Sequence, residues 1–199
     1  MPAASPPTAA VRSFVTLAAM LDPLIDRAAL PADASLAQVV DAVHRIPFGP
    51  PSAPSAQATL DEWRGTGTTK HELLAAALQR GWPQTRPTLV HRVHRCTPEH
   101  ARERFGDEAA AAVPEDGLWD VHRYLLVELG GERVVLDVTY PSMPGWDGSS
   151  SMEVAAGEGT DHEAGPDPDR ELRVLEAAHC DPRSRQSFVT ALTASLASV

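Results

Sequence analysis

Apolar residues recur with helical spacing along the first quarter of the chain. The spacing predicts one helix from Val11 and a second, short one that opens at Asp22–Pro23, because proline is tolerated in the first turn of a helix. Ser35 and Gln38 have the spacing of a capping box, and they predict the start of a third helix that Pro47 ends. The N-terminal part of the chain is therefore predicted to be helical.

The stretch GTGTTKHELLAAALQR predicts a central helix. Thr69 and Glu72 have capping-box spacing, and Gly81 is suited to ending a helix because glycine readily adopts the left-handed conformation. Lys70 and His71 on this helix are candidates for the rim of a cleft, with a solvated helix position as the simpler expectation for Lys70. We expect His44 on the preceding helix to be a surface residue.

The pattern then changes from helical to strand-like. PTLVHRVHRC is rich in β-branched residues and predicts a strand, and two further strand-like runs in residues 119–140 flank Gly130–Gly131, which is the signature of a two-residue hairpin turn. The register that follows from this turn matches opposite charges and apolar residues. Its pairs are Leu129 with Glu132, Glu128 with Arg133, Val127 with Val134 and Leu125 with Leu136.

Continued outward, the same register brings an imidazole and a carboxylate together. Tyr124 comes opposite Asp137, and His122 comes opposite Thr139, so that His122 and Asp137 are diagonal neighbours on one face. Their Cβ atoms are expected roughly 5 to 8 Å apart, within hydrogen-bonding reach.

Loops and short helices are predicted for the remaining segments. Residues 47–58 are rich in proline, and residues 145–168 are rich in Gly, Ser, Asp and Glu, so both predict loops. Thr97–Pro98 predicts the start of a short charged helix, and Asp107 to Pro114 a further turn of helix. Two helices are predicted within residues 170–197, the second starting at Asp181–Pro182 with Phe188, Leu192 and Leu196 on one face.

The length and composition of the chain limit the kinds of protein that it can be. A chain of 199 residues is long enough for one domain with a core, which we expect to span residues 11–199 after a disordered tail of residues 1–10. The net charge of −10 argues against nucleic-acid binding, and no apolar run is long enough to predict a membrane span. Two cysteines are too few for a disulfide framework, so we expect a cytoplasmic protein.

The spacing of the histidines and cysteines, and the order of residues in GTGTTK, argue against a metal site and a nucleotide site. His91 and His94 point to opposite faces of a strand, and only His94 and Cys96 share a side, so we predict neither a metal site nor a cofactor. GTGTTK differs from a Walker loop, in which the lysine precedes the Ser or Thr.

Three segments in order resemble the small bacterial branch of the transglutaminase-like proteins, within the papain-type superfamily. GTGTTKHELL is similar to the helix start that carries the nucleophile, DVHRYLLV to the histidine strand and VVLDVTYP to the aspartate strand. The resemblance covers about residues 36–196, with the core motifs in residues 36–140. It implies an α+β fold with N-terminal helices, a central helix on an antiparallel sheet and C-terminal helices. It also implies that His122 is a general base and Asp137 its orienting carboxylate.

The sequence departs from this family at the nucleophile, because the family's cysteine falls on Gly67. Without a thiolate, acyl transfer by the family's route is not expected. Four hypotheses remain open. In the first, the protein is a catalytically silent pseudoenzyme that binds a ligand or partner. In the second, His122 acts as acid and base on a substrate or water. In the third, one of Thr66, Thr68 and Thr69 is the nucleophile, and in the fourth, Cys96 reaches the site from its strand.

We favour non-thiol chemistry on a small molecule, such as an acyl or amide-type ligand, with His122 and Asp137 as catalytic residues. We expect Gly67, Thr68, Thr69, Lys70 and Tyr124 to bind the substrate. The alternative is a binding or interaction module. An open polar cleft between Gly67 and His122 would favour chemistry, whereas side chains that fill this space would favour a scaffold.

Overall fold

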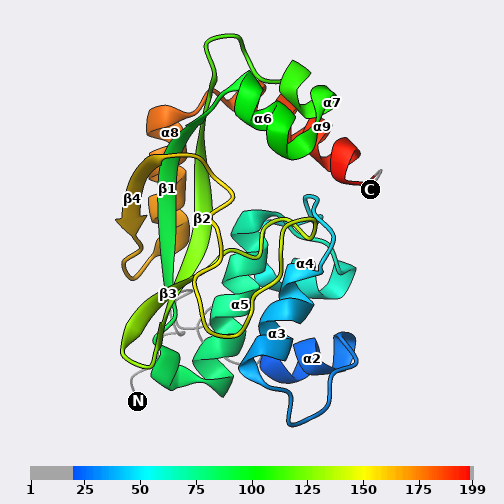
Figure 1. Cartoon of the computed structure of the whole chain (residues 1–199), viewed down its shortest axis with the longest axis vertical. Helices are drawn as coiled ribbons and strands as arrows, with labels where there is room; N and C mark the ends of the chain where they lie inside the picture. The colour runs from blue at the N-terminus through cyan, green and yellow to red at the C-terminus, as the bar shows by residue number, and fades with distance from the viewer. Residues whose placement is uncertain (1–19, 198–199) are drawn as a thin grey trace, which may run out of the picture.

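The computed structural model describes residues 20–197, and within this range the protein has an α+β fold, as predicted. Its strands form one antiparallel sheet in the order β3-β2-β1-β4 (Figure 1). The elements in chain order are α2 (Leu21–Arg27), α3 (Leu36–His44), α4 (Ala56–Glu62), α5 (Gly67–Gly81), a 3-10 turn (Pro83–Thr85), β1 (Thr88–Cys96), α6 (Pro98–Phe105), α7 (Asp107–Ala111), β2 (Leu118–Leu129), β3 (Glu132–Leu136), β4 (Gly159–Glu163), α8 (Pro168–His179) and α9 (Pro182–Ala197).

The β2–β3 hairpin has the predicted turn and register. Gly130 and Gly131 adopt φ angles of 60° and 91°, and positive values at both central positions are what a type I′ turn requires. The pairs run from Leu129–Glu132 to Leu125–Leu136, as expected from the matching of charged and apolar residues. β3 ends at Leu136, so the predicted strand pairs of Tyr124 with Asp137 and of His122 with Thr139 do not form.

Helix α5 begins earlier than predicted. Thr66 is the N-cap residue in an extended conformation, and its N–H donates to Oγ1 of Thr69 at 3.2 Å. Thr69 is therefore the third helical residue, and the predicted capping box of Thr69 with Glu72 is wrong. The helix ends at Gly81, as predicted.

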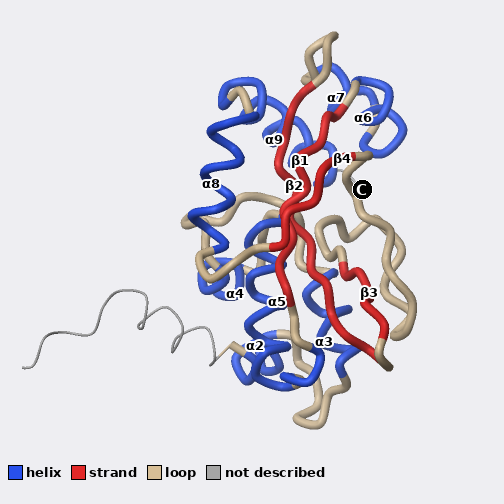
Figure 2. The backbone as a smooth tube through the Cα atoms, turned by 90° about the vertical axis from the view of Figure 1, so that its left-hand side faces the viewer, coloured by secondary structure: helices blue, strands red, loops and turns tan. Residues whose placement is uncertain are grey.

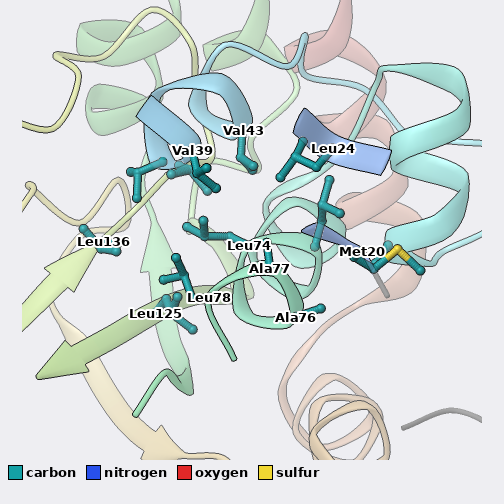
Figure 3. Close-up of a cluster of buried hydrophobic side chains, with 14 of the residues drawn as sticks. Met20, Leu24, Val39, Val43, Leu74, Ala76, Ala77, Leu78, Leu125 and Leu136 are labelled. Carbon is teal, nitrogen blue, oxygen red and sulfur yellow. The ribbon is translucent and has the colours of Figure 1, made fainter. Parts of the chain in front are cut away.

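The main hydrophobic core lies between α5, the N-terminal helices and the hairpin. Leu74 and Leu78 of α5 lie between Val39 and Val43 of α3 and Leu125 of β2, and all five side chains are fully buried (Figure 3). Burial of each such side chain contributes about 2 kcal/mol, so this contact fixes α5 against the sheet.

The other helices cover separate parts of the sheet. α8 runs along one face of β1 and β2, where Leu172 packs against Val93 and Val121 (Figure 2). α6, α7 and α9 gather at the end of the sheet away from α2 and α3 and share a second apolar cluster with Leu118, Tyr140 and other residues (Figure 1). Phe188 and Leu192 of α9 are buried there, as their spacing predicts.

Two elements were not predicted: α4, which begins in the last three residues of the predicted loop 47–58, and β4, which lies inside the predicted loop 145–168. α4 follows the proline-rich connector, with Ser55 as its N-cap residue accepting from the N–H of Ala58. β4 lies within the polar segment 145–168 and pairs with β1, although all five of its residues are exposed. A strand without apolar positions has no alternating pattern, which explains why the sequence does not indicate it.

The predicted helices at the N-terminus are only partly covered by the structure. The helix expected from Val11 lies mostly outside the described residues. α2 starts at Leu21 after Met20, so it begins one residue before the predicted start at Asp22–Pro23, and Asp22 lies in its first turn. Ser35 and Gln38 form the predicted capping box of α3. Among the helices of residues 20–197, none is long and apolar enough to cross a membrane.

Candidate functional site

Asp137 is the centre of a buried hydrogen-bond network. Its Oδ2 accepts from Nε2 of His122 at 2.6 Å and from the N–H of Ala155 at 2.8 Å, and its Oδ1 accepts from the Thr139 hydroxyl at 2.7 Å and the Thr139 N–H at 3.1 Å. Burial alone would raise the pKa of this carboxyl, but His122 and the other donors hold the pKa well below its usual range. Four donors saturate an ionised carboxylate, so Asp137 is an anion.

His122 is oriented by this carboxylate. Because Asp137 is an anion, Nε2 of His122 carries a proton and donates it to the carboxylate, so the other ring nitrogen, Nδ1, is the atom that can act as a base. Among the described residues Nδ1 has no hydrogen-bond partner, yet it is not one of the buried unpaired nitrogen atoms, and 9% of the residue is exposed. Nδ1 therefore reaches solvent as a proton acceptor. The predicted contact between His122 and Asp137 is present, although Asp137 lies just beyond β3.

Thr139 fills the space beside Gly67. A Cβ atom at position 67 would lie 2.8 Å from Oγ1 and 3.1 Å from Cγ2 of Thr139, closer than van der Waals contact allows. Thr139 is itself 2% exposed, and its hydroxyl is engaged by Asp137. The place that a nucleophilic side chain would take at the start of α5 is thus occupied by a neighbouring side chain.

Lys70 is fully buried, so its prediction as a solvated residue is wrong. Nζ donates to the carbonyl oxygens of His44 at 2.9 Å, Ile46 at 2.8 Å and Thr139 at 3.1 Å. Burial lowers the pKa of Lys70 to about 7, whereas Asp137 favours its charged form. Three acceptors match the three donors of an ammonium group. Lys70 therefore joins α5 to two other segments and has no atom free to bind a substrate.

The sequence contains a signal for this role that our prediction missed. Lys70 is the only lysine of the chain, beside sixteen arginines. A side chain with a compact ammonium group is suited to a pocket of converging carbonyl groups, whereas the planar guanidinium of arginine is not. This lysine, in a chain that otherwise uses arginine, is the signal that the sequence offers at this position.

Two buried histidines have structural roles: His71, which was a candidate for the rim of a cleft, and His44, which was expected at the surface. His71 is fully buried, with Nδ1 2.6 Å from the carbonyl oxygen of Gly67 and Nε2 accepting from the N–H of Val138 at 3.0 Å. This pattern requires neutral His71 protonated at Nδ1, and burial lowers its pKa to about 4. His44, expected at the surface, is 2% exposed and bonds through Nε2 to the carbonyl oxygen of Tyr140.

The other predicted binding residues are buried or half-buried. Thr69 is 1% exposed and accepts a hydrogen bond from the Thr59 hydroxyl at 2.6 Å, whereas Thr68 is half-buried. Tyr124 is buried under the guanidinium of Arg92, which lies 5.5 Å from its ring centre. A cavity of about 150 Å³ lies within the 143–153 loop, and the dyad does not line it.

Cys96 does not take the place of the missing thiol. It is 2% exposed, and burial raises its pKa to about 11, so it is a protonated thiol at neutral pH. In the part of the chain that the structure describes, no three His, Cys, Asp or Glu side chains are arranged to hold a metal ion.

Comparisons with known proteins do not assign the chain to a family: no family model, no curated protein and no solved structure matches it.

Proposed function

We propose that the protein hydrolyses a small acyl compound, an ester or an amide, by general-base activation of water at His122. The observation that carries this proposal is the His122–Asp137 pair, in which the carboxylate fixes the tautomer and leaves Nδ1 unbonded and open to solvent. A base oriented in this way contributes typically 10²- to 10⁴-fold to the rate of a proton-transfer reaction.

The reaction needs only water as a co-reactant. The water oxygen attacks the acyl carbon while Nδ1 of His122 takes its proton, and the bond to the leaving oxygen or nitrogen then breaks. The proton passes from His122 to the leaving group, which returns the imidazole to its neutral form.

We also propose that the chain is a transglutaminase-like protein that has lost its nucleophile. The order of helix start, histidine strand and aspartate supports this relation, and the contact of Gly67 with Thr139 supports the absence of a covalent acyl intermediate at this position. The free thiols of Cys96 and Cys180 support a cytoplasmic location.

The test is steady-state turnover of p-nitrophenyl acetate and p-nitroacetanilide by wild type, His122→Asn, Asp137→Asn and a control. His162→Gln is the control because His162 is an exposed histidine of β4. We expect kcat/KM to fall at least about 100-fold in His122→Asn and Asp137→Asn and to be unchanged in His162→Gln. Turnover that survives His122→Asn contradicts the proposal.

A second candidate is a catalytically silent binding or interaction module. It is favoured by the closed space at Gly67 and by the complete burial of Lys70, because filled space beside the helix start is what a scaffold requires. Absence of turnover dependent on His122 with both substrates would support this candidate.

A further inference from the structure

A second imidazole lies beside His122 on the same face of the sheet. In the register of β1 with β2, Arg92 pairs with His122 and His94 pairs with Asp120, so His94 and His122 are diagonal neighbours. Their ring centres are 6.3 Å apart and the rings are nearly perpendicular, at 89°. Asp137 binds His122 from the β3 side, whereas His94 approaches it from β1.

His94 also has one ring nitrogen that is open to solvent. Its Nδ1 is buried and has no partner, whereas Nε2 is neither bonded among the described residues nor one of the buried unpaired atoms. A buried N–H without an acceptor is rare in proteins, so the proton of the neutral ring belongs on Nε2. His94 therefore presents an N–H donor on the face where His122 presents a lone pair.

The charges around His94 keep its ring neutral. Burial lowers the pKa of His94 to about 4, and the nearby His122, His100 and Arg92 act in the same direction, against Asp120. The Asp120 carboxylate is engaged by Arg185 at 2.6 Å and by the N–H of Val121 at 2.8 Å. His94 is thus a neutral imidazole near pH 7.

We propose that His94 is a second catalytic residue, which donates a hydrogen bond from Nε2 to the acyl oxygen that becomes negative when water attacks. This inference rests on the proposed hydrolysis and adds its oxyanion donor. The ligand class is a small ester or amide whose carbonyl oxygen faces β1 and whose attacking water lies at Nδ1 of His122. A preorganised donor of this kind contributes about 100-fold to kcat.

Two variants of His94 separate a donor from a packing role. His94→Phe keeps an aromatic ring and removes the donor, whereas His94→Gln keeps an N–H donor, and His162→Phe on the adjacent strand is the control. With p-nitrophenyl acetate we expect kcat to fall about 100-fold in His94→Phe with little change in KM, to fall less than tenfold in His94→Gln, and to be unchanged in the control.

A binding experiment tests the site without turnover. Methylphosphonate carries negative oxygens on a tetrahedral centre, and its binding is followed by the ¹⁵N imidazole signals of the purified protein. We expect it to shift Nε2 of His94 and Nδ1 of His122, and to bind at least about tenfold more weakly to His94→Phe than to His94→Gln.

The outcomes distinguish this inference from the proposed function. If turnover does not depend on His122 while methylphosphonate binding still depends on the His94 donor, the hydrolysis is wrong and the anion site stands. If both His94 variants lose kcat and methylphosphonate binding equally, or if methylphosphonate does not shift His94, the role of His94 as a donor is wrong.

Discussion

At the residue scale, the contact between Gly67 and Thr139 decides what the start of α5 can hold. We predict that Gly67→Cys lowers the free energy of unfolding by about 1–3 kcal/mol, because its Cβ would lie 2.8 Å from the Thr139 hydroxyl. Thr139→Ala removes this obstacle but also loses the bond to Asp137, about 1 kcal/mol. We expect the loss of unfolding free energy in the double variant to be smaller than the sum of the two single losses, by at least about 1 kcal/mol.

Urea unfolding of the four proteins measures this coupling. Gly145→Cys is the matched control, because a Cβ there has its nearest neighbour at 3.8 Å and meets no obstacle. If the two single losses of unfolding free energy add up in the double variant, Thr139 does not obstruct a side chain at position 67. In the double variant, alkylation by iodoacetamide, located by peptide mapping, shows whether the introduced thiol is more reactive than Cys96 and Cys180.

Lys70 provides a chemical test of the same region. We predict that acylation of its amine by an N-hydroxysuccinimide ester at pH 7.5 is at least about 100-fold slower in the native protein than in urea, because Nζ reacts only when the start of α5 opens. Its pKa of about 7 leaves much of the amine unprotonated at this pH, so only burial can protect it. Peptide mass spectrometry measures the modification.

The control for this labelling is the variant Arg86→Lys. The side chain of Arg86 is 73% exposed, so a lysine at this position reports the rate of an accessible amine in the same folded protein. Equal rates at the two lysines would show that Lys70 is not enclosed by the carbonyl groups of His44, Ile46 and Thr139.

At the element scale, β4 depends on one glycine. A Cβ at Gly159 would collide with the carbonyl oxygen of Val93 and lie 2.9 Å from Cγ of Arg92. We predict that Gly159→Ala detaches β4 from β1, so that amide hydrogen exchange of residues 160–163 becomes at least about tenfold faster. The ion pair of Arg92 with Asp161, at 2.7 Å, is lost in the same event.

Gly157→Ala is the matched control for this strand. It lies two residues earlier in the same segment, and a Cβ there approaches nothing closer than 3.9 Å. Exchange should be unchanged in this variant. Slow exchange of residues 160–163 in Gly159→Ala would mean that β4 accommodates the extra carbon by shifting along β1.

The elements that the sequence predicts well are those with local signals. The hairpin follows from Gly130–Gly131 and from pairs that agree in charge and polarity. Its pairing ends at Leu125–Leu136, and the predicted contact of His122 with Asp137 forms just beyond that pair. β4 could not be predicted, because its pairing depends on Gly159 and Arg92 rather than on apolar residues of its own. The closed space at Gly67 depends on Thr139, which is distant in sequence, and no local pattern reports such a contact.

At the scale of the whole molecule, buried neutral histidines make stability depend on pH. Burial lowers the pKa of His71, His91 and His94 to about 4, from about 6.5 in an unfolded chain. Between these values the unfolded state binds more protons, so the free energy of unfolding falls as the pH falls from 7 towards 4. Each histidine accounts for a loss of about 2 kcal/mol at pH 5.

Glu72 acts in the opposite direction over the same range. Burial and the nearby Asp169 raise its pKa to about 7, so the folded state binds the extra proton between pH 4.5 and 7 and gains about 2 kcal/mol at pH 5. We predict a net loss of roughly 3 kcal/mol from pH 7 to pH 5 in wild type, and a loss larger by about 2 kcal/mol in Glu72→Gln. Asp137 does not contribute here, because its pKa lies below this range.

Urea unfolding followed by circular dichroism at pH 7 and pH 5 measures both changes. Glu132→Gln is the control, since Glu132 is exposed at the hairpin and its replacement should leave the pH dependence as in wild type. Equal stability of wild type at the two pH values would mean that the buried histidines accept protons without unfolding the protein. A smaller loss in Glu72→Gln than in wild type would mean that Glu72 is ionised in the folded state, paired with the buried Arg123.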